Sequence, residues 1–270
     1  MSVRAAFHVT ESGDPHGQPL LFAHGFGCDQ NMWRQVAPCF EDRYRVIRFD
    51  YAGSGGATAP YDADRYATLH GYAADVLAIC RDLDLHDVVF VGHSVSAMVG
   101  VLAEREAPDL FAAHVMVGPS PRYVNDGDYS GGFELADIEG LLDSLASNYL
   151  GWSAAMAPAI MANDDRPELG EELVTSFCTV DPDIAHRFAR ATFLSDNRAD
   201  LPHVRARTLV LQSREDVIAP LEVGRYVAEH VPDGTLVVLD AVGHCPHVSA
   251  PGAVVDAMRR FLEPSPARGS

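Results

Sequence analysis

The sequence predicts an α/β fold built on a mostly parallel sheet with helices on both faces. Two patterns support this: short β-branched runs bounded by turn residues, and helical stretches between most of those runs. Strands that are apolar at consecutive positions are typical of parallel strands covered on both faces. With 270 residues, the chain is long enough for one large domain. We expect strands near Leu21, Ile47, Val89, Val115, Val210 and Val237.

The helices of this core are expected over residues 65–85, 95–106, 221–230 and 253–262. Between residues 119 and 201 the alternation stops, and only helical stretches remain, over 134–149, 152–161, 168–178 and 182–193. An insertion between two strands belongs over their carboxyl ends, where open α/β sheets bind ligands. We therefore predict a core formed by residues 1–118 and 202–263, a four-helix cap over 119–201, and a disordered tail over 264–270.

Composition excludes several classes of function. The chain is 47% apolar and 21% charged, with 20 basic and 38 acidic residues and a net charge of −18. Such an acidic protein repels polyanions, so we expect no nucleic acid and no membrane surface as partner. It has neither a span of about 20 apolar residues nor an apolar leader, which predicts a cytoplasmic location. The five scattered cysteines are interpreted as thiols.

The segment VVFVGHSVSAM, residues 88–98, places a serine where an apolar strand runs into a helix. Ser94 is preceded two positions earlier by Gly92 and followed two positions later by the small residue Ser96. This is the pattern of a nucleophile elbow, a strained turn that exposes the serine hydroxyl at a helix N-terminus. The common pattern has glycine where Ser96 stands, and an ordinary helix N-cap serine is the alternative. The strand-to-helix position favours a nucleophile.

A serine hydroxyl needs a base to activate it, and the base needs an acid to orient it. The later sequence offers both in the order serine, acid, histidine. Asp216 lies in the loop after the strand near Val210, and His244 lies in the loop after the strand near Val237. The sequence therefore predicts a catalytic triad of Ser94, Asp216 and His244.

Two other acids compete for the orienting role. Glu215 and Asp240 stand close to the same loops in the sequence. Asp216 also has a plainer alternative, because a loop carboxylate at this position can cap the helix that follows Pro220.

Two other histidines compete for the role of the base. His93 is adjacent to Ser94 in the elbow and is expected to point away from it. His247 lies three residues after His244, and the pair invites a metal site. No nearby carboxylate or third histidine completes such a site, so we expect no metal.

Backbone N–H groups in tight turns are expected to stabilise the oxyanion of the transition state. We predict one donor at Val95, directly after the nucleophile, and one at Phe26 in the turn His24-Gly25-Phe26-Gly27. A second glycine-rich turn covers residues 50–58. It lacks the spacing of a dinucleotide fingerprint, so we expect no nicotinamide or flavin and assign Asp50 a structural role in the turn.

With these features in place, the sequence resembles the α/β-hydrolase superfamily over nearly its whole length. Within it, the chain is most similar to RsbQ-type bacterial stress-signalling hydrolases and to their plant relatives, the karrikin and strigolactone receptors. Ser96 in the elbow is itself typical of this subfamily. The resemblance is carried by HGFGCDQNMW (24–33), FDYAGSG (49–55), VGHSVSAMVG (91–100), SPRYVND (120–126) and GHCPHVSAP (243–251).

The resemblance implies an α/β-hydrolase fold with an eight-stranded sheet, the triad named above, four cap helices over a closed apolar pocket, and no cofactor. Such a pocket favours a small hydrophobic ester or lactone over a charged metabolite. The resemblance also implies an alternative, a signalling protein whose ligand binding or slow hydrolysis regulates a partner such as a PAS-domain phosphatase or other signalling protein. The implied pocket residues are Phe26, Tyr123, Phe133, Trp152, Met156 and Phe193. Each cap aromatic has packing between helices as its alternative role.

Overall fold

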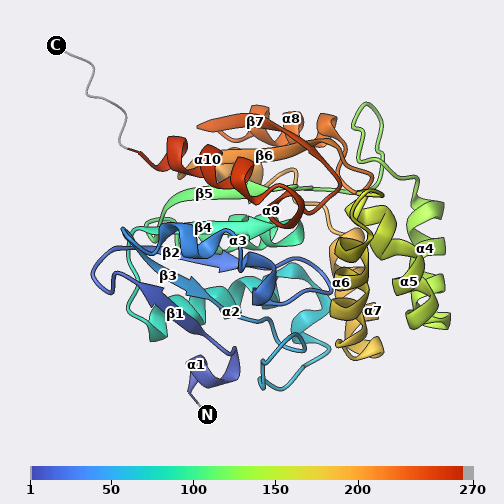
Figure 1. The fold of residues 1–270 in the computed structure, drawn as a ribbon, viewed down its shortest axis with the longest axis horizontal. Coiled ribbons are helices and arrows are strands. Elements are labelled where there is room, and N and C mark those ends of the chain that lie inside the picture. The colour runs from blue at the N-terminus through green and yellow to red at the C-terminus, as the bar shows by residue number, and fades with distance from the viewer. Residues whose placement is uncertain (1, 264–270) are drawn as a thin grey trace.

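The computed structural model describes residues 2–263, and the predicted tail over 264–270 lies outside this range. One mostly parallel sheet with the strand order β1-β3-β2-β4-β5-β6-β7 forms the centre of the molecule (Figure 1). Among the strands of residues 2–263, only β1 is antiparallel, and it pairs with β3. The strands are β1 (Thr10–Gly13), β2 (Gln18–Ala23), β3 (Tyr44–Arg48), β4 (Val88–His93), β5 (Phe111–Val117), β6 (Arg207–Glu215) and β7 (Gly234–Val242).

The α/β class and the mostly parallel sheet are confirmed, and all six strands expected from apolar runs are present. The expected number of eight strands is wrong, because the described residues form a seven-stranded sheet. The segment ahead of β1 forms a short helix, α1 (Val3–Ala6), capped by the Ser2 side chain. The N–H groups of Ala5, Ala6 and Phe7 bond within that helix and its caps, so the segment adds no further edge strand. The strand β1 has the sequence TESG, which contains no apolar run, so it was not predicted from the sequence.

Helices cover both faces of the sheet and a third group lies beyond one end of it (Figure 1). Most predicted helices agree with the structure to within a few residues. The helix predicted from residue 65 instead begins at Leu69, because Thr68 is extended with φ −136° and ψ 167° and separates it from a short 3-10 turn. The helices after α1 are α2 (Leu69–Asp82), α3 (Val95–Glu106), α4 (Leu135–Ser147), α5 (Tyr149–Met161), α6 (Pro167–Cys178), α7 (Pro182–Phe193), α8 (Leu221–His230), α9 (Pro246–Ser249) and α10 (Pro251–Leu262), with 3-10 turns η1 (Gln30–Trp33), η2 (Ala37–Phe40), η3 (Arg65–Ala67) and η4 (Leu201–His203).

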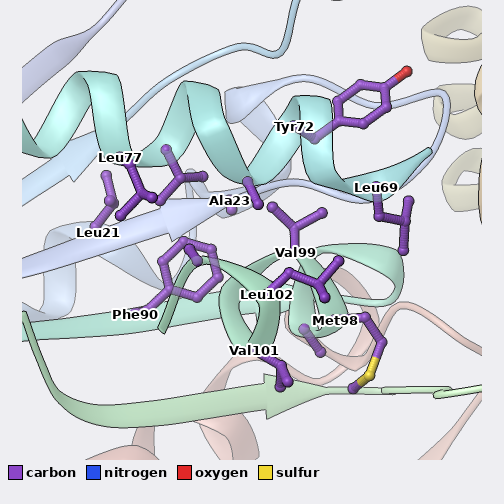
Figure 2. Packing of buried hydrophobic residues seen from close by; sticks show 14 of the residues in the cluster. Leu21, Ala23, Leu69, Tyr72, Leu77, Phe90, Met98, Val99, Val101 and Leu102 are labelled. Carbon is purple, nitrogen blue, oxygen red and sulfur yellow. The ribbon is translucent and has the colours of Figure 1, made fainter. Parts of the chain in front are cut away.

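Alternate residues of the central strands enter two different apolar clusters. Leu21 and Phe90 belong to a cluster with α2, α3 and α8, whereas Phe22 and Val91 belong to one with η1, η2 and α10. Successive strand side chains point to opposite faces, so a strand covered on both faces has to be apolar throughout. This explains why the strands were visible in the sequence as continuous apolar runs. Figure 2 shows part of the first cluster, to which Val99 and Leu102 of α3, Leu69 and Tyr72 of α2, and Ala23 and Phe90 of the sheet all belong.

The four helices α4–α7 lie between β5 and β6 in the chain, and we call them the cap helices. In Figure 1 they stand together at the right, beside one end of the sheet. They form an apolar cluster of their own that includes residues from the loops after β2, β6 and β7. The exact boundaries of core and cap stay a prediction, but this packing places the cap helices over the loops that carry the predicted site.

Candidate active site

Ser94 occupies the turn between β4 and α3. Its backbone has φ 56° and ψ −123°, a positive-φ conformation that a residue with a side chain adopts only under constraint. The constraint is the close approach of strand and helix, because a Cβ on Gly92 would lie 2.7 Å from the backbone carbonyl group of Ser96. The strained turn expected at Ser94 is therefore present, and Ser94 lines a cavity beneath the cap helices.

Ser96, where the common elbow has glycine, makes two buried hydrogen bonds. Its Oγ donates to the carbonyl oxygen of His24 at 2.5 Å and lies 2.8 Å from the hydroxyl of Tyr51. The serine thus ties the elbow to the turn that follows β2. This contact gives the departure from the common pattern a physical reason.

The three residues of the predicted triad meet although they come from three distant loops. His244 Nε2 lies 2.8 Å from Ser94 Oγ, and His244 Nδ1 lies 2.7 Å from Asp216 Oδ2. All three residues are buried. These distances are those of ordinary hydrogen bonds, so the arrangement forms one continuous chain from carboxylate to hydroxyl.

The carboxylate of Asp216 also organises its own loop. Its Oδ1 accepts the backbone N–H groups of Ile218 at 2.8 Å and Ala219 at 3.1 Å. The plainer alternative, in which Asp216 caps the helix after Pro220, is wrong, because Oδ1 holds the turn before α8 while Oδ2 contacts His244. The N-cap position of α8 is Pro220, and no side-chain hydrogen bond caps this helix end.

The rival acids and bases take no part in the hydrogen-bonded chain from Asp216 through His244 to Ser94. Asp240 is 86% exposed and pairs with an arginine, and Glu215 is exposed. His93 Nε2 donates to the backbone carbonyl of His244 at 3.0 Å, so His93 binds the backbone of the loop that carries His244. His247 stacks on His93, with ring centroids 4.3 Å apart, and neither of its ring nitrogens has a hydrogen-bond partner within residues 2–263.

Burial sets the protonation of the groups around the triad. It lowers the pKa of His93 well below its ordinary value and lowers the pKa of His247 to about 3, so both rings are neutral. Burial likewise raises the pKa of the Cys28 thiol to about 12 and raises the pKa of the Cys245 thiol well above its usual range. Both cysteines line the cavity, but as protonated thiols they are weak nucleophiles.

The two predicted oxyanion donors come from the segments that follow β4 and β2. Val95 is the first residue of α3, so its N–H has no acceptor within the helix. Phe26 lies in the turn after β2 and lines the same cavity as Ser94. A Cβ on Gly25 would lie 2.5 Å from His93 Nδ1, so glycine is needed for this turn to approach the elbow.

The second glycine-rich turn has the architecture expected of it. The Asp50 carboxylate accepts the backbone N–H of Gly56 at 2.9 Å and that of Gln30 at 2.8 Å. Asp50 therefore joins its own turn to the segment after β2, which is a structural role.

The cavity above Ser94 and His244 is lined mainly by apolar side chains. Of the pocket residues that the resemblance implied, Phe26, Trp152, Met156 and Phe193 line it. Tyr123 and Phe133 do not. Tyr123 is buried beside the cavity with its hydroxyl 3.4 Å from Ser94 Oγ, and Phe133 forms a backbone bridge with Val124.

Several lining residues were missed from the sequence. Ile160 follows Trp152 and Met156 at helical spacing on α5, so this periodicity could have identified it. The others come from separate loops and helices, and no local pattern marks them. The missed residues are Cys28, His93, Leu141, Ile160, Leu173, Phe177, Thr192, Ile218 and Cys245.

The described residues give no support to a metal site or a membrane span. Within residues 2–263, no group of three or more His, Cys, Asp or Glu side chains is arranged to hold a metal ion. No helix in the same range has the length and apolar character needed to cross a bilayer.

A fold with a strained serine between a parallel strand and a helix, beneath inserted helices, defines a class of hydrolases. Residues 20–257 match the family described as "Alpha/beta hydrolase family", and the chain belongs to this family. The prediction of an enzyme of the α/β-hydrolase fold is confirmed.

Among individual proteins, the chain is 39% identical to karrikin insensitive 2 receptor CA of Petunia hybrida, over 91% of this chain and 92% of that protein. It is also 39% identical to strigolactone esterase D14 of Arabidopsis thaliana, over 91% and 93% of the two chains. Of solved structures, a hydrolase from Oleispira antarctica superposes with a TM-score of 0.94 at 40% identity, over 97% of each chain. The resemblance to the plant receptors is confirmed, and the resemblance to RsbQ-type proteins stays a prediction.

Proposed function

We propose that this protein hydrolyses a small apolar carboxylic ester or lactone through an acyl-enzyme formed on Ser94. The observation that carries the proposal is the unbroken hydrogen-bonded chain from Asp216 through His244 to Ser94, which ends in a mainly apolar cavity. A carboxylate, an imidazole and a hydroxyl in this order are the groups that acyl transfer by a serine requires.

In the proposed reaction, Ser94 Oγ attacks the ester carbonyl while His244 Nε2 accepts its proton. Asp216 holds the proton on His244 Nδ1 and stabilises the imidazolium that forms. The backbone N–H groups of Val95 and Phe26 stabilise the oxyanion, and each such donor typically contributes about 3 kcal/mol. His244 then protonates the leaving alcohol, and a water activated by the same ring releases the acid.

The lining of the cavity supports a neutral substrate. Lys, Arg, Asp and Glu are absent from the part of the lining that the described residues form, and the thiols there are protonated. A charged group brought into such a site would lose its hydration without a partner, whereas an ester or lactone needs no counter-ion. The proposed substrate is therefore small, uncharged and mostly apolar.

The test is turnover of a short-chain nitrophenyl ester and of a lactone panel by the wild-type protein and by Ser94→Ala. We expect Ser94→Ala to lose at least about 10³-fold in kcat, because the nucleophile is gone. Ser153→Ala is the matched control, since Ser153 is a buried serine that only donates to a carbonyl within α5. Intact mass spectrometry should detect an acyl adduct on the wild type and none on Ser94→Ala. Full turnover by Ser94→Ala would refute the assignment.

We also propose that the same site serves signalling. Support comes from the 39% identity to a protein named as a receptor and from the cap helices that wall the cavity. In this proposal, ligand in the cavity changes the outer surface of the cap helices, and a cytoplasmic partner such as a PAS-domain phosphatase reads that change. Hydrogen exchange of Ser94→Ala with and without a bound ester tests it. Unchanged exchange over α4–α7 at saturating ester would count against the proposal.

A further inference from the structure

The loop that carries His244 is attached by its backbone to the cap. The N–H of His244 donates to the carbonyl oxygen of Ile160, in the last turn of α5, at 2.8 Å. On the other side, His93 Nε2 donates to the carbonyl oxygen of His244. Both backbone polar groups of His244 are therefore bound by residues from other elements, and displacement of the loop breaks one of these bonds.

Two side chains from the connection between α5 and α6 extend this attachment. Asn163 Nδ2 donates to the carbonyl oxygens of Met161 and Val242, the second at 3.2 Å. Arg166 donates from Nη2 to Asn163 Oδ1 and from Nη1 to the carbonyl oxygen of Ser249 at 2.8 Å. We call these two residues the Asn163–Arg166 clasp. Because Val242 precedes His244 and Ser249 follows it, the clasp holds the loop at both ends.

The backbones of the two segments also touch. The helix α5 ends at Met161, and its C-cap residue Ala162 has φ +49°, so the chain turns and leaves the last carbonyl groups of the helix free to bind outside it. Gly243 has φ +87°, and a Cβ there would lie 2.0 Å from the carbonyl oxygen of Met161. Only glycine allows this approach, so the contact depends on the sequence of the loop itself.

The wall of the cavity and the proposed base are thus parts of one bonded unit. Trp152, Met156 and Ile160 line the cavity from α5, and Ile160 is also the residue that accepts the N–H of His244. The substrate would lie against the same helix that fixes the position of the imidazole.

We propose that Asn163 and Arg166 are positioning residues for His244, which they act on through the backbone at Val242 and Ser249. The proposal rests on the proposed function. Neither side chain lines the cavity, so their removal should lower kcat and leave KM nearly unchanged. A displacement of about 1 Å at a catalytic group can cost about 10²-fold in rate.

The experiment uses two variants of the full chain. Asn163→Asp keeps the shape and the Arg166 contact but removes the donor to Val242, and Arg166→Ala removes the bond to Ser249. We expect kcat for a nitrophenyl ester to fall about 10- to 100-fold in each, with KM within about threefold. Arg166→Lys keeps a positively charged donor within reach of Ser249 and should restore part of the loss.

A control variant separates the positioning of His244 from a general effect on the stability of α5. Asn148 accepts the N–H of Gly151 at the opposite end of the same helix. Asn148→Ala should weaken α5 but leave kcat within about twofold, with thermal melting used to compare folding in all variants. Equal losses in Asn148→Ala and the clasp variants, or unchanged kcat in the clasp variants, would overturn the inference. If the wild type has no esterase activity, the proposed function fails instead. The rate at which a fluorophosphonate labels Ser94 then still reports whether the clasp variants impair activation of Ser94 by His244.

Discussion

Ser94 and His244 are the two ends of one hydrogen bond, yet the structure holds them in different ways. Ser94 is held by its immediate neighbours, since its N–H donates to Val117 on the adjacent strand and its carbonyl accepts the N–H of Ala97 in its own helix. His244 is held by residues about 80 and 150 positions earlier in the chain, Ile160 and His93. The proposed nucleophile is therefore held by the adjacent strand and its own helix, and the proposed base by residues far more distant in the chain.

This difference predicts which property, stability or turnover, a substitution near each residue should change. A change near Ser94 acts on a turn built into the packing of the sheet, so its cost should appear mainly in stability. A change near His244 acts on the orientation of a ring, so its cost should appear mainly in turnover. The following substitutions test this division.

Asp216→Asn should have the largest effect. The amide keeps the shape of the side chain but cannot hold His244 in the tautomer that accepts a proton from Ser94, and kcat should fall by about 10³- to 10⁴-fold. Asp240→Asn is the matched control, because Asp240 is an exposed acid of β7, the strand that precedes the loop of His244. Steady-state kinetics on a nitrophenyl ester measure both. Comparable losses in the two variants would contradict the assignment of Asp216.

Ser96→Ala should act on stability. Removing the hydroxyl leaves the carbonyl oxygen of His24 and the buried hydroxyl of Tyr51 without this partner, at a cost of about 1–3 kcal/mol in the free energy of unfolding. Urea denaturation measures the loss, and kcat per folded molecule should stay within about tenfold of wild type. A large loss of kcat with unchanged stability would contradict the conclusion that changes near Ser94 act mainly on stability.

His247 should contribute the smallest effect, through pH. In the unfolded chain its pKa is near 6.5, whereas burial lowers the folded value to about 3, so the unfolded state binds more protons between these values. Above about pH 6.5 the ring is neutral in both states and this cost is absent, and stability falls by about 1.4 kcal/mol for each pH unit between about 6.5 and 3. Buried His93 adds to the loss in the same direction.

His247→Phe removes this dependence while keeping an aromatic ring against Trp33, whose centroid lies 4.5 Å away. The loss of unfolding free energy between pH 7 and 5.5 should be about 1 kcal/mol smaller in the variant. His70→Phe serves as control because His70 is 63% exposed. An identical pH dependence in wild type and His247→Phe would show that His247 is protonated in the folded state.

Much of the site could be predicted from the sequence because its parts are local signals. The elbow at Ser94 follows from an apolar strand, a glycine and a helix in direct succession. Asp216 and His244 could be singled out because each follows a recognisable strand, and the carboxyl ends of parallel strands meet at one edge of a sheet. The central strands were visible because burial on both faces requires consecutive apolar residues.

Other features have no local signal. The edge strand β1 has a polar sequence and exists because β3 offers it a partner. Tyr123 and Phe133 were placed in the cavity by resemblance, but the direction of a side chain depends on what packs around it. Cys28 and Ile218 could not be assigned to the cavity because the helices that enclose it come from a different stretch of the chain.

The sequence by itself determined the class of fold, the position of the strained serine and the identity of its partners, because each depends on residues that are neighbours in the chain or follow successive parallel strands. Only the tertiary structure decided how His244 is held and which side chains wall the cavity. Hydrogen bonds such as those from Asn163 to Val242 and from Arg166 to Ser249 join positions about 80 residues apart. No periodicity encodes such a contact, since it arises only when the cap helices and the sheet pack together.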